Sequence, residues 1–214
     1  AGRRSLGRTE WLSAGRTAEL LPGVRRRGLA GGVRYWDGQF DDARLALALA
    51  RTAVSRGAVV LNHLAVTGLT RERGQLRGLT ARDDETGESF AIAARCIVNA
   101  TGVWVDDLRR MDHDAAAAPD EGVRRALVAP SQGVHLVVDR RFLPGSHALM
   151  VPKTDDGRVL FAVPWLGKTI LGTTDTPRAD IVREPRPFRE EVDFILQTAA
   201  RYLEHPPTRA DVRS

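Results

Sequence analysis

One stretch of this chain joins a short apolar run to a turn of small residues and then to two acids. It covers residues 97–107, with the sequence IVNATGVWVDD. Ala100 and Gly102 carry little or no side chain, so the backbone can approach a ligand closely at this turn. Asp106 and Asp107 suit the first turn of a helix, where carboxylates meet the positive end of the dipole. The stretch predicts a buried strand, a tight turn and a helix start. In α/β proteins this arrangement brings the backbone close to a bound phosphate. The same residues also fit an ordinary buried strand that ends in a glycine turn.

The composition indicates a globular protein. Of its 214 residues, 43% are hydrophobic and 28% are charged, which permits one large domain or two small ones. No apolar run approaches the roughly 20 residues that a membrane span needs. The N-terminal segment AGRRS has no apolar core after its basic residues, so it does not fit a signal peptide. Because the chain also lacks an initiator methionine, we expect it to be a piece of a longer protein.

Charged and reactive side chains narrow the possible binding partners and kinds of site. The net charge is +5, but the arginines are scattered and no aromatic residues interleave the one basic run, residues 25–27. Nucleic-acid binding is therefore not expected, whereas a phosphorylated substrate or contact with lipid headgroups fits equally well. The only cysteine, Cys96, excludes an intrachain disulfide and fits a reducing cytoplasm; beside an apolar run it predicts an inert core thiol. The five histidines are too widely spaced for a local metal motif, so no metal site is predicted.

Hydrophobic periodicity predicts the order of the elements. Helices are expected at residues 13–20, 42–56, 104–111 and 189–203, the first two capped by Ser13 and Asp41. Buried parallel-type strands are expected at 58–62 and 95–100. Between these two strands, three runs predict a β-meander, at 66–71, 75–82 and 89–93. After Pro130, four runs predict an antiparallel sheet, at 133–139, 148–152, 158–164 and 168–173, with a turn at residues 166–167 between the last two.

Polar residues near the turns are candidates for a site, and each also has a structural explanation. His135, next to a glycine, suits a substrate ligand or an acid–base, although the residues alone favour a hydrogen-bonded structural histidine. Residues 172–176, GTTDT, would either form a hydrogen-bonded turn or line a polar pocket. The same ambiguity applies to four residues around the second helix: Asp37, Asp41, Asp42 and Arg44.

Two familiar types of active site are not supported. The chain contains neither G-x-G-x-x-G nor G-x-x-x-x-G-K-[ST], so it carries no direct nucleotide-binding fingerprint. Ser131 lies in a variant of a nucleophile elbow, but a strand follows it where that motif requires a helix, which argues against a serine hydrolase.

Five motifs, in the same order, resemble those of FAD-dependent glycerol-3-phosphate dehydrogenases. They are residues 35–45 (YWDGQFDDARL), 98–104 (VNATGVW), 131–135 (SQGVH), 161–165 (FAVPW) and 172–176 (GTTDT). Together they span about residues 31–177, so a chance match is remote. This family is part of the D-amino-acid-oxidase-like flavoproteins.

The resemblance implies a mixed α/β (α+β) fold class. The chain would contain part of a Rossmann-like FAD-binding domain with a β-meander, plus an antiparallel-sheet substrate domain. The implied assignments, in chain order, are 1–40 to the substrate domain, 41–111 to the FAD-binding domain with its meander at 66–93, 112–122 to a mobile loop, 123–187 to the antiparallel substrate sheet, and 188–214 to a helix and truncated tail.

The resemblance also implies a cofactor and site residues. FAD would be bound through the backbone of Val66 at the adenine and along the turn of the second motif. His135 would point into the substrate pocket, which reverses the preference drawn from the residues alone. The implied cofactor-binding residues are Val66, Ala100, Thr101, Gly102 and Trp104.

The implied reaction is oxidation of sn-glycerol 3-phosphate to dihydroxyacetone phosphate. Hydride would pass to the flavin, His135 would remove or hold the hydroxyl proton, and electrons would reach a membrane quinone. The protein would be cytoplasmic, with peripheral contact at the inner face of the membrane. The alternatives are an oxidase that uses oxygen, such as a glycerol-3-phosphate oxidase, and a non-catalytic remnant or binding module.

Two departures from the family pattern matter. Val103 replaces the usual proline, so the turn is less rigid. The family's N-terminal Gly-rich pyrophosphate strand and its C-terminal arginine and lysine segments have no counterpart here. We therefore expect the chain to correspond to the middle of the enzyme, and neither to bind FAD tightly nor to turn over alone.

Overall fold

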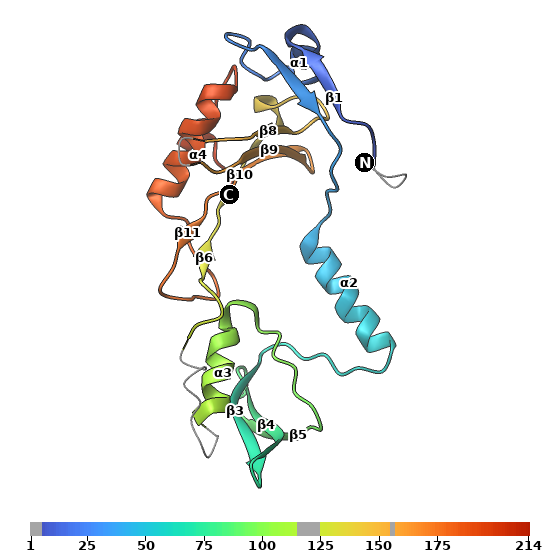
Figure 1. The fold of residues 1–214 in the computed structure, drawn as a ribbon, viewed down its shortest axis with the longest axis vertical. Helices are drawn as coiled ribbons and strands as arrows, with labels where there is room; N and C mark the ends of the chain where they lie inside the picture. Colours follow the sequence, from blue (N-terminus) through green and yellow to red (C-terminus); the bar gives the residue numbers. More distant parts are fainter. Residues whose placement is uncertain (1–5, 115–124, 155–156) are drawn as a thin grey trace. The chain divides into compact units, whose positions relative to one another are not determined.

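The computed structural model describes residues 6–114, 125–154 and 157–214. Two compact units make up the chain (Figure 1). The first, the sheet unit, comprises Ala1–Gly38 and Ser131–Ser214, so it is formed by two separate stretches of sequence. The second, the meander unit, comprises Gln39–Pro130.

A four-stranded antiparallel sheet of order β7-β10-β9-β8 forms the centre of the sheet unit. Leu166 and Gly167 join β9 to β10 and have positive φ angles of 44° and 77°. Positive φ at both central residues matches the twist of a two-residue hairpin, which confirms the turn predicted here. The four strands are β7 (His135–Asp139), β8 (Leu149–Val151), β9 (Leu160–Trp165) and β10 (Lys168–Gly172).

Helix α4 (Arg189–Tyr202) contributes one apolar face to the core of the sheet unit. Val192, Ile195 and Ala199 recur at helical spacing and are buried, and the helix itself was predicted at 189–203. The core contains the inward-facing residues of the strands and the residues around them: Val134, Leu136, Val138, Phe142, Leu143, Val151, Leu160, Ala162, Leu171 and Leu203.

Short elements complete the sheet unit. Strands β1 (Glu10–Ser13) and β2 (Gly31–Arg34) pair with each other, and helix α1 (Ala14–Leu20) lies between them in sequence. The side chain of Ser13 accepts a hydrogen bond from the Arg16 backbone at 3.2 Å, which confirms the predicted cap. Strands β6 (Ser131–Gln132) and β11 (Thr176–Pro177) form a second small ribbon.

The C-terminal residues lie along the outer edge of β7. After the 3₁₀ helix η4 (Arg209–Asp211), the backbone N–H of Arg213 donates to the carbonyl of Val137 at 2.8 Å. The N–H of Val137 in turn donates to the carbonyl of Ser214 at 2.7 Å. No sequence motif predicted this pairing, because backbone hydrogen bonds do not depend on side-chain identity.

The meander unit contains the three antiparallel strands that the sequence predicts, in the order β3-β4-β5. The register shifts between Val66 and Gly68, so Thr67 is an extra residue, a β-bulge, in β3. The strands are β3 (Leu64–Glu72), β4 (Gln75–Asp83) and β5 (Ser89–Ala93). The helices are α2 (Asp42–Ser55), capped by Asp41, and α3 (Val105–Asp114), preceded by the 3₁₀ helix η1 (Gly102–Trp104).

Two strand predictions are wrong. Residues 58–62 and 95–100 form no strand, and most of their apolar side chains are exposed, with Val59 83% and Val98 81% exposed. A parallel strand is stable only beside a neighbouring strand, and in the described part of the chain neither segment has one. Cys96 is exposed for the same reason, so the expected core thiol is also wrong.

The expected mobile loop at 112–122 begins too early. Residues 112–114 are still part of α3, and Asp112 forms an ion pair with Arg71 of β3. This pair ties the end of the helix to the meander sheet. The remainder of the predicted loop, 115–122, lies outside the described residues.

Candidate functional site

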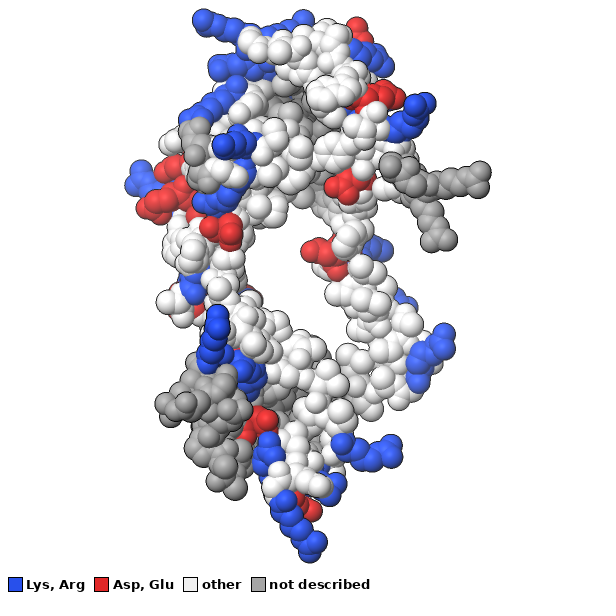
Figure 2. Space-filling view, in the orientation of Figure 1, with Lys and Arg blue, Asp and Glu red and all other residues white. Residues whose placement is uncertain are grey.

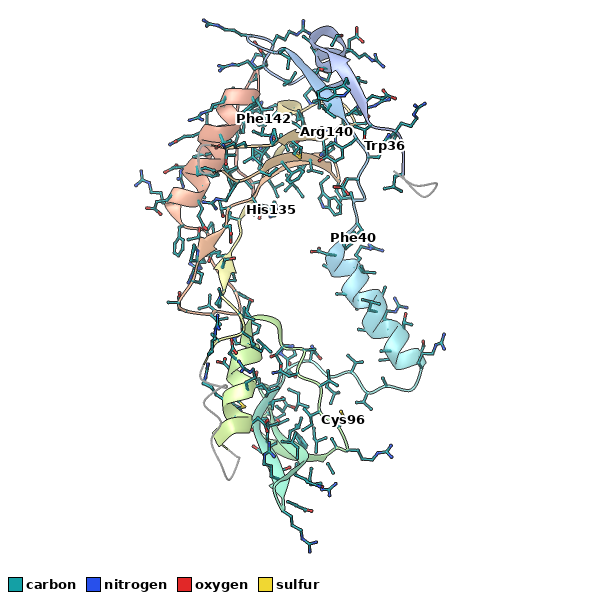
Figure 3. The ribbon with its side chains drawn as sticks, viewed as in Figure 1. Trp36, Phe40, Cys96, His135, Arg140 and Phe142 are labelled. Carbon is teal, nitrogen blue, oxygen red and sulfur yellow. The ribbon has the colours of Figure 1, made fainter. Side chains whose placement is uncertain are left out.

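His135 begins β7 directly opposite Gly172, the last residue of β10. A methyl group on Gly172 would lie 2.5 Å from Cδ2 of His135 and 2.8 Å from the carbonyl oxygen of Val134. These distances are shorter than van der Waals contact, so the histidine ring lies over a position that only glycine allows. Two of the sequence motifs, SQGVH and GTTDT, therefore meet at this ring. Figure 3 labels His135 among the side chains.

His135 lies on the face of the sheet opposite the core. Alternation along β7 buries Leu136 and Val138, whereas His135 is exposed and Val137 is half-buried. Because directly paired residues share a face, the same face includes further half-buried apolar residues of the neighbouring strands. These are Met150, Phe161, Val163 and Ile170. A half-buried apolar surface that ends at the His135 ring suits a flat, largely apolar ligand. The ring would then lie beside a reacting hydroxyl of a substrate.

A buried carboxylate, Glu191, connects the segments on either side of His135. Its Oε2 accepts hydrogen bonds from Nε2 of Gln132 and from the backbone of Phe188, both at 2.8 Å. Its Oε1 accepts from the hydroxyls of Thr174 at 3.2 Å and Thr176 at 2.6 Å. Burial raises the pKa of Glu191, but these four hydrogen bonds outweigh burial, so the pKa lies below its ordinary value. The carboxylate is therefore ionised at neutral pH.

Two further contacts extend this network. The Thr174 hydroxyl accepts a hydrogen bond from the backbone N–H of Val134 at 3.1 Å, one residue before the histidine. The guanidinium of Arg178 donates to Oε1 of Gln132 and lies 4.9 Å from the centre of the Phe188 ring. A side-chain hydrogen bond to Asp180 raises the pKa of Arg178, which stays charged. The amide of Gln132 is thus held at both ends.

In the meander unit, Asn99 fixes the turn that the sequence singled out. Its Nδ2 donates to the carbonyl of Val105 at 3.0 Å, and its Oδ1 accepts from Oγ1 of Thr101 at 2.8 Å. Gly102 has a φ of 58°, and a methyl group placed on it would meet nothing within 4 Å. Asn99 thus holds the turn by two hydrogen bonds, and the glycine backbone is open, which fits a cofactor that passes close to the backbone.

Val66 and Trp104 are the other candidates in this unit. Val66 pairs with Ala81 immediately before the bulge, in the edge strand of the meander. Half of the peptide groups of an edge strand point away from the sheet, so β3 offers backbone groups to a ligand, as an adenine contact requires. Trp104 ends η1 and is 38% exposed. The residues present therefore fit FAD.

The structure separates the predicted site residues into two groups. His135 belongs to the sheet unit, where it meets Gly172, whereas five predicted cofactor residues belong to the meander unit: Val66, Ala100, Thr101, Gly102 and Trp104. Glu191 was missed by the sequence reasoning. Its only sequence signal is an acid three residues after the N-cap residue Phe188, which indicates a helix start rather than a site.

Two kinds of feature are absent from residues 6–114, 125–154 and 157–214, the described part of the chain. There, no group of three or more His, Cys, Asp or Glu side chains is arranged to hold a metal ion. No helix in the same ranges has the length and apolar character to cross a bilayer. On the face shown in Figure 2, basic side chains are spread over several places, with acidic ones among them.

Comparison with known proteins identifies the family. The family described as FAD dependent oxidoreductase (DAO) matches residues 1–214, the whole chain. The mitochondrial glycerol-3-phosphate dehydrogenase of Arabidopsis thaliana is 40% identical over 221 residues, covering 100% of this chain and 34% of that protein. The mitochondrial glycerol-3-phosphate dehydrogenase of Homo sapiens is 39% identical over 209 residues, covering 95% of this chain and 28% of that protein.

A solved structure agrees with these relatives. The glycerol-3-phosphate dehydrogenase of Bacillus halodurans, complexed with FAD, superimposes with a TM-score of 0.80 at 36% identity. The match covers 95% of this chain and 40% of that one, and the chain spans about a third of the length of the curated relatives. The resemblance, the mixed α/β fold class and the FAD cofactor class drawn from the sequence are confirmed. The chain belongs to the family of FAD dependent oxidoreductases.

Proposed function

We propose that this chain is part of a flavin enzyme that oxidises sn-glycerol 3-phosphate to dihydroxyacetone phosphate. The observation that carries the proposal is the position of His135, whose ring lies over Gly172 where two family motifs meet. The half-buried apolar face beside the ring would lie against a flat cofactor. The names of the relatives, which are glycerol-3-phosphate dehydrogenases, support the choice of substrate.

Different residues of this chain would bind the cofactor and transfer the proton. Val66, Ala100, Thr101, Gly102 and Trp104 would hold FAD, which supplies the two-electron chemistry when bound. His135 would accept the proton of the substrate's C2 hydroxyl, because a neutral imidazole is a base near physiological pH. The network around Glu191 would keep the backbone just before the histidine, and the segment around Thr174, in place.

The electron acceptor in this proposal is a membrane quinone. The relatives are named dehydrogenases, which favours an acceptor other than oxygen. Because quinones reside in the lipid phase, the intact enzyme would work at the inner face of the membrane through peripheral contact, with its catalytic part in the cytoplasm.

The test is His135→Ala in the full-length protein that contains this chain. We expect kcat to fall by roughly 10²–10⁴-fold, the usual contribution of a positioned acid–base group. The visible flavin spectrum and the melting temperature should change little, because the side chain is exposed. His205→Ala, which alters another exposed histidine of the sheet unit, is the matched control. Absence of bound flavin in the wild-type protein would remove the proposal, and equal turnover of the variant would remove the role of His135.

A further inference from the structure

We propose that Glu191 is a positioning residue for His135, a role that rests on the proposed function. Glu191 lies in the first turn of α4 and is only 5% exposed. An ionised carboxylate is costly to bury unless hydrogen bonds satisfy it. Four donors reach this one, and three of them belong to the two segments that hold the histidine, residues 131–135 and 172–176.

The first connection runs through Thr174. Its hydroxyl donates to Oε1 of Glu191 at 3.2 Å and accepts from the N–H of Val134 at 3.1 Å. A hydroxyl has one proton, so donation to the carboxylate leaves its lone pairs for the backbone N–H. The negative charge of Glu191 therefore sets the direction of the hydroxyl. The hydroxyl in turn holds the backbone one residue before His135.

The second connection runs through Gln132. Its Nε2 donates to Oε2 of Glu191 at 2.8 Å, while its Oε1 accepts from Arg178. Gly133 lies between the two held residues and is closely packed, since a methyl group on it would lie 2.9 Å from Oγ1 of Thr173. The residues on both sides of Gly133 are thus fixed by the same carboxylate.

A purely structural role for Glu191 is the competing explanation. The carboxylate also accepts from the N–H of Phe188, as a capping-box acid does at the start of a helix. Capping alone would affect the stability of α4 and leave the histidine unaffected. Positioning would affect turnover through the histidine, because a displacement of about 1 Å costs as much as a hundredfold in rate.

The experiment is Glu191→Gln in the full-length, FAD-loaded enzyme, with sn-glycerol 3-phosphate as substrate. This change keeps the shape of the side chain but removes the charge and replaces one acceptor oxygen by a donor. We expect kcat per bound flavin to fall by roughly tenfold to a hundredfold, with a smaller change in KM. Glu190→Gln removes the same charge from the same helical turn, where the side chain is exposed, and should leave kcat unchanged.

A double-mutant cycle separates the two explanations. If Glu191 acts through the histidine, adding Glu191→Gln to His135→Ala should lower kcat by less than about twofold further. An equal loss in both backgrounds would overturn the positioning role while leaving the proposed function intact. A flavin-loaded wild-type enzyme that does not oxidise the substrate would overturn both.

A second variant covers the case in which Glu191→Gln does not fold. Thr174→Val has nearly the same shape and breaks the contact to the Val134 backbone, while Glu191 keeps its charge and three of its four donors. It should reproduce the fall in kcat, and the loss should again vanish in the His135→Ala background. Unchanged kcat in Thr174→Val would overturn the proposal.

Discussion

The sheet unit forms its own hydrophobic core, whereas most apolar side chains of the meander unit are exposed. Leu136, Val138 and Leu171 of the sheet unit are at most 2% exposed. Among the described residues of the meander unit, the only buried hydrophobic side chain is that of Ala81. Helix α2 in that unit has no buried residue at all.

The difference follows from the kind of strand that each unit contains. Antiparallel hairpins find their partners a few residues away, so β9 and β10 pair whatever else surrounds them. Parallel-type strands need partners from distant parts of a chain, and both faces must be covered. The open runs at 58–62 and 95–100 have the composition of such strands without their neighbours.

The largest expected effect tests this contrast in packing. Leu171→Ala, at a fully buried position, should lower the free energy of unfolding by about 2–5 kcal/mol. Leu61→Ala makes the same chemical change at a position that is 64% exposed, and should change the free energy of unfolding by no more than about 0.5 kcal/mol. Chemical denaturation of this chain measures both values. A comparable loss for the two variants would mean that the 58–62 segment is buried in solution.

An intermediate effect is expected at the start of α2. Asp41 caps this helix by accepting from the backbone of Arg44 at 3.0 Å. Asp41→Ala should destabilise the helix by about 1 kcal/mol, whereas Asp41→Asn keeps a good cap and should cost little. Hydrogen exchange of the α2 amides measures this change. Because no side chain of α2 is buried, the amides of the sheet unit should exchange as before; faster exchange there would show that the two units are coupled.

The smallest expected effect is a pH dependence that belongs to the sheet unit. Hydrogen bonds from Lys168 at 2.6 Å and Arg213 at 3.0 Å lower the pKa of Asp139 from 3.8 to about 2. Since the folded-state pKa is the lower one, this stabilisation is complete above about pH 4 and is lost as the pH falls towards 2.

Asp139→Asn should therefore slightly reduce the loss of folding stability that occurs as the pH falls from about 4 towards 2. The effect should shrink at high salt, because the ion pairs are partly exposed. Thermal melting between pH 2 and pH 5 measures it, with Glu184→Gln, an exposed acid of the same unit, as the control. An unchanged pH dependence in Asp139→Asn would rule out the two ion pairs as its source.

The features that sequence reasoning predicted are those with local causes. Ser13 and Asp41 cap helices through donors three residues away, and Leu166 and Gly167 form a turn between adjacent strands. The same locality explains why the meander was predicted correctly. The family motifs predict a place in the substrate pocket for His135, where the residues alone favoured a structural role, and this stays a prediction.

The features that were missed depend on distant parts of the chain. Cys96 was expected in a core because its neighbours are apolar, but apolar neighbours are buried only when something covers them. Glu191 lies 59 residues from Gln132 in sequence, and no local pattern indicates that the two side chains meet. An acid in a first helical turn ordinarily stabilises the helix start, and only the structure shows the other three donors to Glu191.

The pairing of the C-terminal residues with β7 has a consequence for association between molecules. An edge strand with free N–H and carbonyl groups can recruit a strand from another chain, and so starts edge-to-edge aggregation. At Val137 both backbone groups are already occupied, by Ser214 and Arg213. The strand that begins with His135 is thereby protected at its edge by the chain's own backbone, and this protection leaves the apolar face beside the histidine free.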